Sequence, residues 1–153
     1  MRWAWAIFLL VGVCSCGPSP LFSETLDTSP QGWTTAEELT YEIEVEAVDQ
    51  QYELQLLIDH STEYRYQNIY FKIKTGFPDR DAKEEQLSVD LATKSGEWLG
   101  DCSAAKCKTK VYLLDNFKFP TAGTYTFEIS QYTREENLKG INSLELSLFQ
   151  KTK

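Results

Sequence analysis

Catalytic chemistry in this sequence would have to be built on its single histidine, His60. A Ser-His-Asp or Cys-His arrangement needs that imidazole as its base. His60 follows a predicted strand, within the polar stretch 59–63, so we expect it in a surface loop with no chemical role. The sequence also has no Walker loop, no G-x-G-x-x-G and no H-E-x-x-H pattern. We therefore predict no enzyme activity, no catalytic residue, no metal site and no cofactor.

The carboxylates do not change this expectation, although the chain has 23 acidic residues. A glycosidase needs two carboxyl groups about 5–9 Å apart in a cleft, and sequence spacing does not establish such a distance. We interpret the adjacent acidic pairs as solvated charges on loops or strand ends.

Cys16 is the residue for which the sequence predicts a covalent modification. Arg2 precedes an apolar run over residues 3–13, a pattern typical of a secretory signal and too short for a membrane-spanning helix. The run ends in Val-Cys-Ser-Cys, which resembles the lipobox of bacterial lipoproteins, whose last cysteine is acylated, for example with palmitate. We predict that residues 1–15 are removed and that Cys16 carries the lipid; two or three acyl chains give stable anchoring. The alternative is an ordinary signal peptide with two incidental cysteines.

Cys102 and Cys107 form the second cysteine pair, in a stretch of Gly, Asp, Ser, Ala and Lys typical of a loop. A zinc site needs about four ligands, and a redox pair normally has the C-x-x-C spacing. In an exported protein a lone nearby pair is most often a disulfide. We predict a Cys102–Cys107 bond that contributes about 2 kcal/mol; a redox pair, a metal site and free thiols are the alternatives.

The net charge of −8 restricts the partners of the chain. Nucleic acids and anionic lipid headgroups both bind to basic patches, so neither is an expected electrostatic partner. The charge is compatible with a protein or a sugar partner.

Alternating apolar and polar residues predict seven strands and no helix of useful length. The predicted strands cover residues 41–47, 52–58, 69–73, 87–91, 111–114, 125–129 and 144–148. Strands with one polar face belong to antiparallel sheets that bury their apolar faces against each other. We predict an all-β, antiparallel, two-sheet β-sandwich that resembles a jelly roll. It forms a single domain over residues 33–153, after a lipidated N-terminus and linker over 16–32 with a short strand around 21–26.

Tyrosines and tryptophans are the remaining candidates for ligand contact. Tyr64, Tyr66 and Tyr70 gather around the start of one predicted strand, where they either pack at an edge or form a ligand platform. Trp33 and Trp98 are the side chains that decide on sugar binding. If both are buried, a sugar loses its best platform.

Three segments and one short motif carry a resemblance to a known family. The segments are residues 64–71 (an aromatic stretch leading into a strand), 95–100 (G-x-W-L-G) and 116–131 (F-P-x-x-G-x-Y-x-F-x-I-x-Q), and the motif is L-x-G-I at 138–141. With the lipobox, this order resembles the gliding-motility lipoprotein H family (GldH) over the whole chain. Arg65, in place of an expected proline, and the Cys102/Cys107 pair depart from the pattern.

The resemblance implies a lipid-anchored accessory protein of the bacterial gliding-motility machinery, with no catalytic residue to carry over. The predicted lipid, flexible spacer and rigid acidic sandwich indicate a non-enzymatic binding or scaffold module held at a membrane. Its expected partners are other envelope proteins of the gliding and type IX secretion apparatus, together with the membrane through the N-terminal lipid. We expect it in the cell envelope at the outer membrane, with the periplasmic face favoured because residues 17–20 lack an acidic run. The alternative function is a surface glycan-binding lipoprotein.

Overall fold

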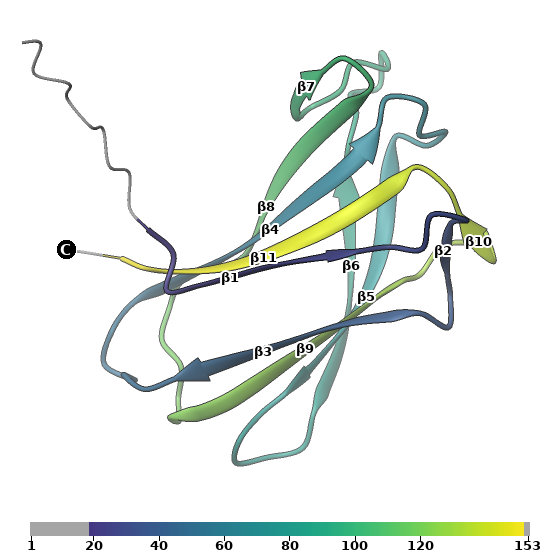
Figure 1. The fold of residues 1–153 in the computed structure, drawn as a ribbon. Helices are drawn as coiled ribbons and strands as arrows, with labels where there is room; N and C mark the ends of the chain where they lie inside the picture. The colour runs from purple at the N-terminus through teal and green to yellow at the C-terminus, as the bar shows by residue number, and fades with distance from the viewer. Residues whose placement is uncertain (1–18, 152–153) are drawn as a thin grey trace, which may run out of the picture.

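Antiparallel strands make up the regular secondary structure of residues 19–151, the part of the chain that this computed structural model describes (Figure 1). They are β1 (Phe22–Asp27), β2 (Trp33–Thr34), β3 (Glu38–Val45), β4 (Tyr52–Ser61), β5 (Asn68–Gly76), β6 (Lys83–Asp90), β7 (Asp101–Ser103), β8 (Lys106–Phe117), β9 (Gly123–Gln131), β10 (Asn137–Leu138) and β11 (Ile141–Gln150). Within this range no helix is long and apolar enough to cross a membrane. The predicted signal peptide 1–15 and Cys16 lie outside the described residues.

The strands form two facing sheets and a small ribbon. One sheet has the order β1-β11-β4-β8-β7, the other has the order β3-β9-β5-β6, and β10 pairs with β2. The longer strands alternate between the two sheets, apart from the β5–β6 hairpin. This winding of eight long strands is that of a jelly roll. The predicted all-β, antiparallel sandwich with a jelly-roll character is confirmed.

The core lies between the sheets and follows from the period-two pattern of the sequence. In β3 and β4 every second side chain is buried, as expected when one face of a strand faces a second sheet. Tyr41 is wholly buried among these side chains, and its hydroxyl donates to the Leu144 carbonyl at 2.8 Å. Burial raises the pKa of this phenol, which therefore stays neutral and satisfies its hydroxyl inside the core.

The sheet begins earlier in the chain than the expected domain start at Trp33. β1 lies within the predicted linker 16–32 and corresponds to the short strand expected around residues 21–26. It is an edge strand that pairs with β11 from Phe22↔Leu148 to Asp27↔Ser143, and most of its side chains are exposed. Because only one side of β1 is paired and little of it is buried, its apolar pattern is weak and its role in the sheet is hard to recognise from sequence.

Both ends of the described chain lie at one end of the sandwich, which we call the near end (Figure 1). There the Leu21 amide donates to the Leu148 carbonyl at 2.7 Å, and the Lys151 amide donates to the Gln51 carbonyl at 2.8 Å. The far end is formed by the connections 62–67, 91–100 and 132–136, which join the opposite ends of the same strands. The two ends are therefore separated by the length of the strands.

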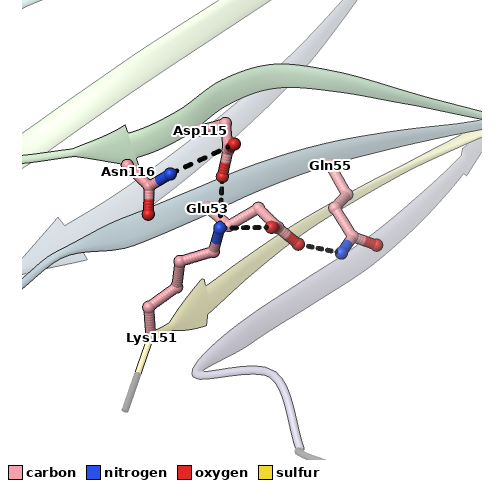
Figure 2. Close-up of polar contacts among 5 residues, drawn as sticks. All are labelled: Glu53, Gln55, Asp115, Asn116 and Lys151. Atoms are coloured by element: carbon pink, nitrogen blue, oxygen red, sulfur yellow. Dashed lines mark hydrogen bonds and ion pairs between the residues drawn. The ribbon is translucent and has the colours of Figure 1, made fainter. Parts of the chain in front are cut away.

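A cluster of charged side chains surrounds Lys151, the last described residue, at the near end (Figure 2). The Lys151 ammonium lies 3.2 Å from the Glu53 carboxylate and pairs with Asp115, which also accepts from the Asn116 side chain. The hydrogen bond from Lys151 lowers the pKa of Asp115. Exposed ion pairs contribute little stability, so this cluster orients the chain end more than it holds the fold.

Candidate functional site

A groove of about 680 Å³ at the far end is the best candidate site in the described part of the chain. Its lining consists of Tyr64, Tyr66, Asn68, Tyr70, Gln86, Tyr132, Thr133, Arg134 and Glu135. We call it the tyrosine groove. The residues come from the start of β5 and the connection before it, from β6, and from the connection after β9.

The outer wall of the tyrosine groove follows from strand parity and from the register of two strands. Tyr70 points outward from β5 because Ile69 and Phe71, its neighbours in sequence, are buried in the core. β9 pairs with β5, and directly after it the Tyr132 amide donates to the Tyr70 carbonyl at 2.8 Å. Tyr66, Tyr70 and Tyr132 are 38%, 47% and 49% exposed, so their rings are accessible to a ligand.

Tyr64 forms the rigid floor of the groove. Its ring is buried, its hydroxyl donates to the Asn68 carbonyl at 3.1 Å, and its edge meets the Tyr66 ring at 5.6 Å between centroids. Burial raises the pKa of this phenol, so Tyr64 stays neutral. Gly140 of the L-x-G-I motif lies against it with φ +93°, and a Cβ there would come within 3.2 Å of the Tyr64 Cα. Glycine is thus required at this position both by conformation and by space.

The connection 132–135, which follows β9 and lines the groove beside Tyr70, is held in place by one buried amide. The Gln131 side chain donates to the Glu135 carbonyl at 2.8 Å. Its oxygen accepts from the Thr133 amide at 2.9 Å and from the Thr133 hydroxyl at 2.7 Å. Buried polar groups that are fully satisfied in this way rigidify their surroundings. This connection is therefore organised before any ligand arrives.

Charged residues around the groove orient its rings. The Tyr66 hydroxyl donates to the Glu135 carboxylate, and this hydrogen bond raises the pKa of Tyr66. The Lys72 ammonium lies 5.2 Å from the centre of the Tyr132 ring, within the range of a cation–π contact. The groove therefore combines exposed phenol rings with amide, cationic and anionic side chains, a set of groups suited to binding a ligand.

His60 is not in a surface loop, and that prediction is wrong. It is 0% exposed near the end of β4, with its ring 4.8 Å from the Trp98 ring between centroids. Nδ1 lies 3.1 Å from the Ser61 carbonyl oxygen, and desolvation lowers the pKa of the imidazole. The parity of Leu56, Ile58 and His60 already places all three on the same face of β4. The strand continues past the apolar run because Trp98 covers His60.

Only one of the two tryptophans is fully buried. Trp33 is wholly buried, and its indole nitrogen donates to the Glu37 carbonyl at 2.9 Å. Trp98 is half-buried against His60 and packs on the core. Trp33 is therefore unavailable as a sugar platform, and the more exposed aromatic rings at this end belong to Tyr66, Tyr70 and Tyr132.

Cys102 and Cys107 occupy directly opposed positions of β7 and β8, where they form a disulfide in the structure. Cys107 is buried and lies opposite His60 in the pairing of β8 with β4, whereas Cys102 is exposed. The bond lies in a hairpin outside the tyrosine groove. Among residues 19–151, no three His, Cys, Asp or Glu side chains gather as a metal site.

A second opening of about 420 Å³ lies between β6 and β8, on the side of the sandwich where β6 is the edge strand of its sheet and only the short β7 lies beyond β8. Core side chains such as Leu54, Phe119 and Phe127 line it. We interpret it as the open side of the sandwich, because core side chains form its inner wall and the exposed side chains of β6 and of the turn before it form its rim.

Sequence reasoning found one half of the tyrosine groove and missed the other. The Tyr64, Tyr66 and Tyr70 set was recognisable because it gathers around one strand start. Tyr132, Arg134 and Glu135 join it only through the β5–β9 register, in which Phe71 pairs with Gln131. Residues 60 positions apart in sequence carry no local signal of that contact.

Comparison with known proteins gives one family and a few relatives. The model of the GldH lipoprotein family matches residues 21–148. A "Gliding motility lipoprotein GldH homolog" of Christiangramia forsetii (strain DSM 17595 / CGMCC 1.15422 / KT0803) is 26% identical over 150 residues, which are 95% of this chain and 91% of that relative.

Two solved structures resemble the fold more remotely. TmCBM61 in complex with β-1,4-galactotriose has a TM-score of 0.39 and 16% identity, over 74% of this chain and 62% of that one. The GH115 4-O-methyl-α-glucuronidase BtGH115A has a TM-score of 0.49 and 8% identity, over 99% of this chain and 20% of that one. Likenesses at this level carry no information about ligand or activity.

Proposed function

The chain belongs to the GldH lipoprotein family, and from that premise we propose that it is a non-enzymatic scaffold of the gliding-motility machinery. In this proposal it holds a rigid β-sandwich between the membrane and other components of the cell envelope. Its protein partners are envelope proteins of the gliding and type IX secretion apparatus.

Membership of a lipoprotein family places the chain at a membrane of the cell envelope. The finer assignment belongs to the proposal: residues 1–15 are removed, Cys16 is acylated, and the anchor sits in the periplasmic face of the outer membrane. The lipobox supports acylation at Cys16. The absence of an acidic run in residues 17–20 supports the periplasmic face.

The observation that carries the scaffold role is the separation of the two ends of the sandwich. The described chain starts at the near end, so a lipid on the preceding segment attaches there (Figure 1). The tyrosine groove lies at the far end, one strand length away. A module held in this way directs the groove away from its anchor and toward whatever lies beyond the membrane surface.

Two features support a role without catalysis. The single histidine is buried against Trp98 and has no path to a substrate. The groove itself offers phenol rings, amides, one arginine and one glutamate, and its lining holds no Ser–His or Cys–His pair. Binding is the chemistry that this set of groups performs best.

Spreading of cells on agar tests the proposal. Deleting the protein should abolish spreading while growth on simple sugars continues, and the wild-type chain should restore it. Cys16→Ala should remain an unprocessed precursor outside the lipid-modified fraction and should not restore spreading. Cys102→Ser, which leaves the anchor intact, is the matched cysteine control and should restore it. Full spreading of the deletion strain would contradict the role in motility.

A further inference from the structure

We propose that the tyrosine groove binds a pyranose glycan of the cell envelope. This inference rests on the proposed function, because it names the ligand of the surface that the scaffold directs away from the membrane. The platform lies on tyrosines and does not use Trp33, which is wholly buried, or Trp98, which packs against His60.

The ring faces of the groove fit the faces of a sugar. A pyranose presents C–H bonds on its flat faces, and these stack on aromatic rings. Tyr70 on β5 and Tyr132 directly after the neighbouring β9 are both exposed, and the Tyr132 amide donates to the Tyr70 carbonyl. The Tyr66 ring is also exposed and stands edge-on to Tyr64. The groove thus offers three exposed phenol rings on which sugar units can stack.

Hydrogen-bonding side chains surround these rings and fit the hydroxyl edge of a sugar. The side chains of Asn68, Gln86 and Arg134 line the groove and make no hydrogen bond to another described residue. Glu135 uses one oxygen for Tyr66 and keeps the other. Amides, a guanidinium and a carboxylate supply both donors and acceptors, as a ligand with many hydroxyl groups requires.

The composition of the lining favours a glycan over a peptide or a polyanion. Its nine residues include no Leu, Ile, Val, Met or Phe, so the groove has no aliphatic pocket to anchor an apolar side chain. Its one arginine and one glutamate balance in charge, which gives no attraction for a nucleic acid. Aromatic faces surrounded by amides and one pair of opposite charges remain, and this combination suits a ligand rich in hydroxyl groups.

The groove is also organised in advance. Gln131 fixes residues 133–135, the Asn68 carbonyl holds the Tyr64 hydroxyl, and Glu135 holds Tyr66. A ligand therefore does not have to order the loop, and less binding free energy is lost on complex formation.

Two sources of pyranose glycan are available to an envelope protein: the cell wall and the surface polysaccharides. The lipidated protein in detergent micelles would be tested with each, by co-sedimentation with purified peptidoglycan sacculi and by native affinity electrophoresis with polysaccharide extracted from the same cells. We expect binding to at least one of these probes, and the probe that binds identifies the source. Binding to neither overturns the proposal.

Variants of the tyrosines separate ring stacking from non-specific adhesion. Tyr70→Ala and Tyr132→Ala should each weaken binding roughly 3- to 10-fold, while Tyr70→Phe, which keeps the ring, should bind like the wild type. Tyr112→Ala is the matched control, because Tyr112 is 57% exposed on β8 outside the groove. Unchanged binding by the groove variants, or an equal loss in Tyr112→Ala, overturns the proposal. Near-ultraviolet circular dichroism verifies that each variant is folded.

Spreading on agar distinguishes this inference from the proposed function. If Tyr70→Ala/Tyr132→Ala loses glycan binding in vitro and the cells still spread, the glycan ligand stands and the motility role of the groove fails. If the wild type binds no glycan and a photo-crosslinker at Tyr70 captures an envelope protein instead, the glycan ligand fails and the scaffold role stands.

Discussion

The two ends of the sandwich use the same residue type in opposite ways. At the near end Tyr52 and Tyr125 point inward, and their hydroxyls donate to the Ala47 and Thr121 carbonyls at 2.6 and 2.8 Å. Their rings pack on Phe119, with centroids 5.2 and 4.7 Å away. At the far end Tyr66, Tyr70 and Tyr132 leave their rings in solvent. The near-end tyrosines Tyr52 and Tyr125 close the core, whereas the far end buries Tyr64 beneath the groove and presents the rings of the other three tyrosines at a surface.

This difference implies that stability and binding are separable in this molecule. A near-end ring is enclosed by other side chains, so its removal leaves a cavity. A far-end ring has neighbours on one side only, so its removal exposes little that was buried. Substitutions at the two ends should therefore have different primary effects, which the following variants test in order of expected size.

Leu146→Asp should unfold the whole sandwich, so that both stability and binding are lost. Leu146 is wholly buried in β11, and an unpaired carboxylate in that position costs several kcal/mol. Far-ultraviolet circular dichroism and urea denaturation would follow the loss of structure. Thr25→Asp, on the exposed side of β1, is the control and should stay folded. A cooperative transition for Leu146→Asp at the wild-type urea concentration would contradict this account of the core.

Tyr125→Ala compared with Tyr70→Ala tests the difference between the ends directly. Tyr125 is 1% exposed, so its truncation should lower the free energy of unfolding by about 3–5 kcal/mol. Tyr70→Ala should change it by no more than about 0.5 kcal/mol, as for most surface positions. Urea denaturation of the two variants measures both values. Equal losses of stability would mean that the far-end rings are structural.

Removal of the disulfide should have a smaller effect that is confined to the β7–β8 hairpin. The native protein should have an intact mass about two units below that of the reduced protein, since bridging removes two hydrogens. Cys102→Ser/Cys107→Ser should lower stability by about 2 kcal/mol at most and leave the tyrosine groove intact. Both thiols reacting with an alkylating agent in the native oxidised protein would exclude the bond.

The change of stability with pH should be the smallest of these effects, and we expect it to come from the buried His60. Desolvation lowers the folded-state pKa of His60 below its ordinary value of 6.5. The unfolded chain therefore binds more protons between the folded pKa and 6.5. Stability is fully present above about pH 6.5 and is lost progressively as pH falls toward the folded pKa. Urea midpoints at pH 8 and pH 5 measure the change, and His60→Phe should reduce the histidine part of it.

His60 also illustrates which features were predictable. The fold class followed from sequence because two-residue periodicity in seven segments leaves few alternatives to a sandwich. The same periodicity, continued two residues past Ile58, would have placed His60 inside. Its polar neighbours Asp59 and Ser61 point to the other face of β4. Together with His60 they form a polar stretch, which is why the sequence predicted a loop here.

The half of the tyrosine groove that follows β9 could not be predicted from the sequence. Tyr70 and Tyr132 meet because β9 pairs with β5 after a long excursion through β6, β7 and β8. Such contacts depend on the winding of the whole chain, and sequence periodicity does not encode which strands become neighbours. The residues were identifiable as exposed aromatics, but their gathering into one site was not.

The position of β1 has a mechanical consequence. β1 starts at the near end and pairs antiparallel with β11 over its whole length, from Phe22↔Leu148 to Asp27↔Ser143. A load between the N-terminal segment and the far end pulls β1 along its own axis. The hydrogen bonds to β11 lie across that axis, so they resist sliding together instead of opening one by one. The β1–β11 hydrogen bonds are thus loaded in shear. This geometry slows unfolding under force, which suits a protein that transmits a mechanical load.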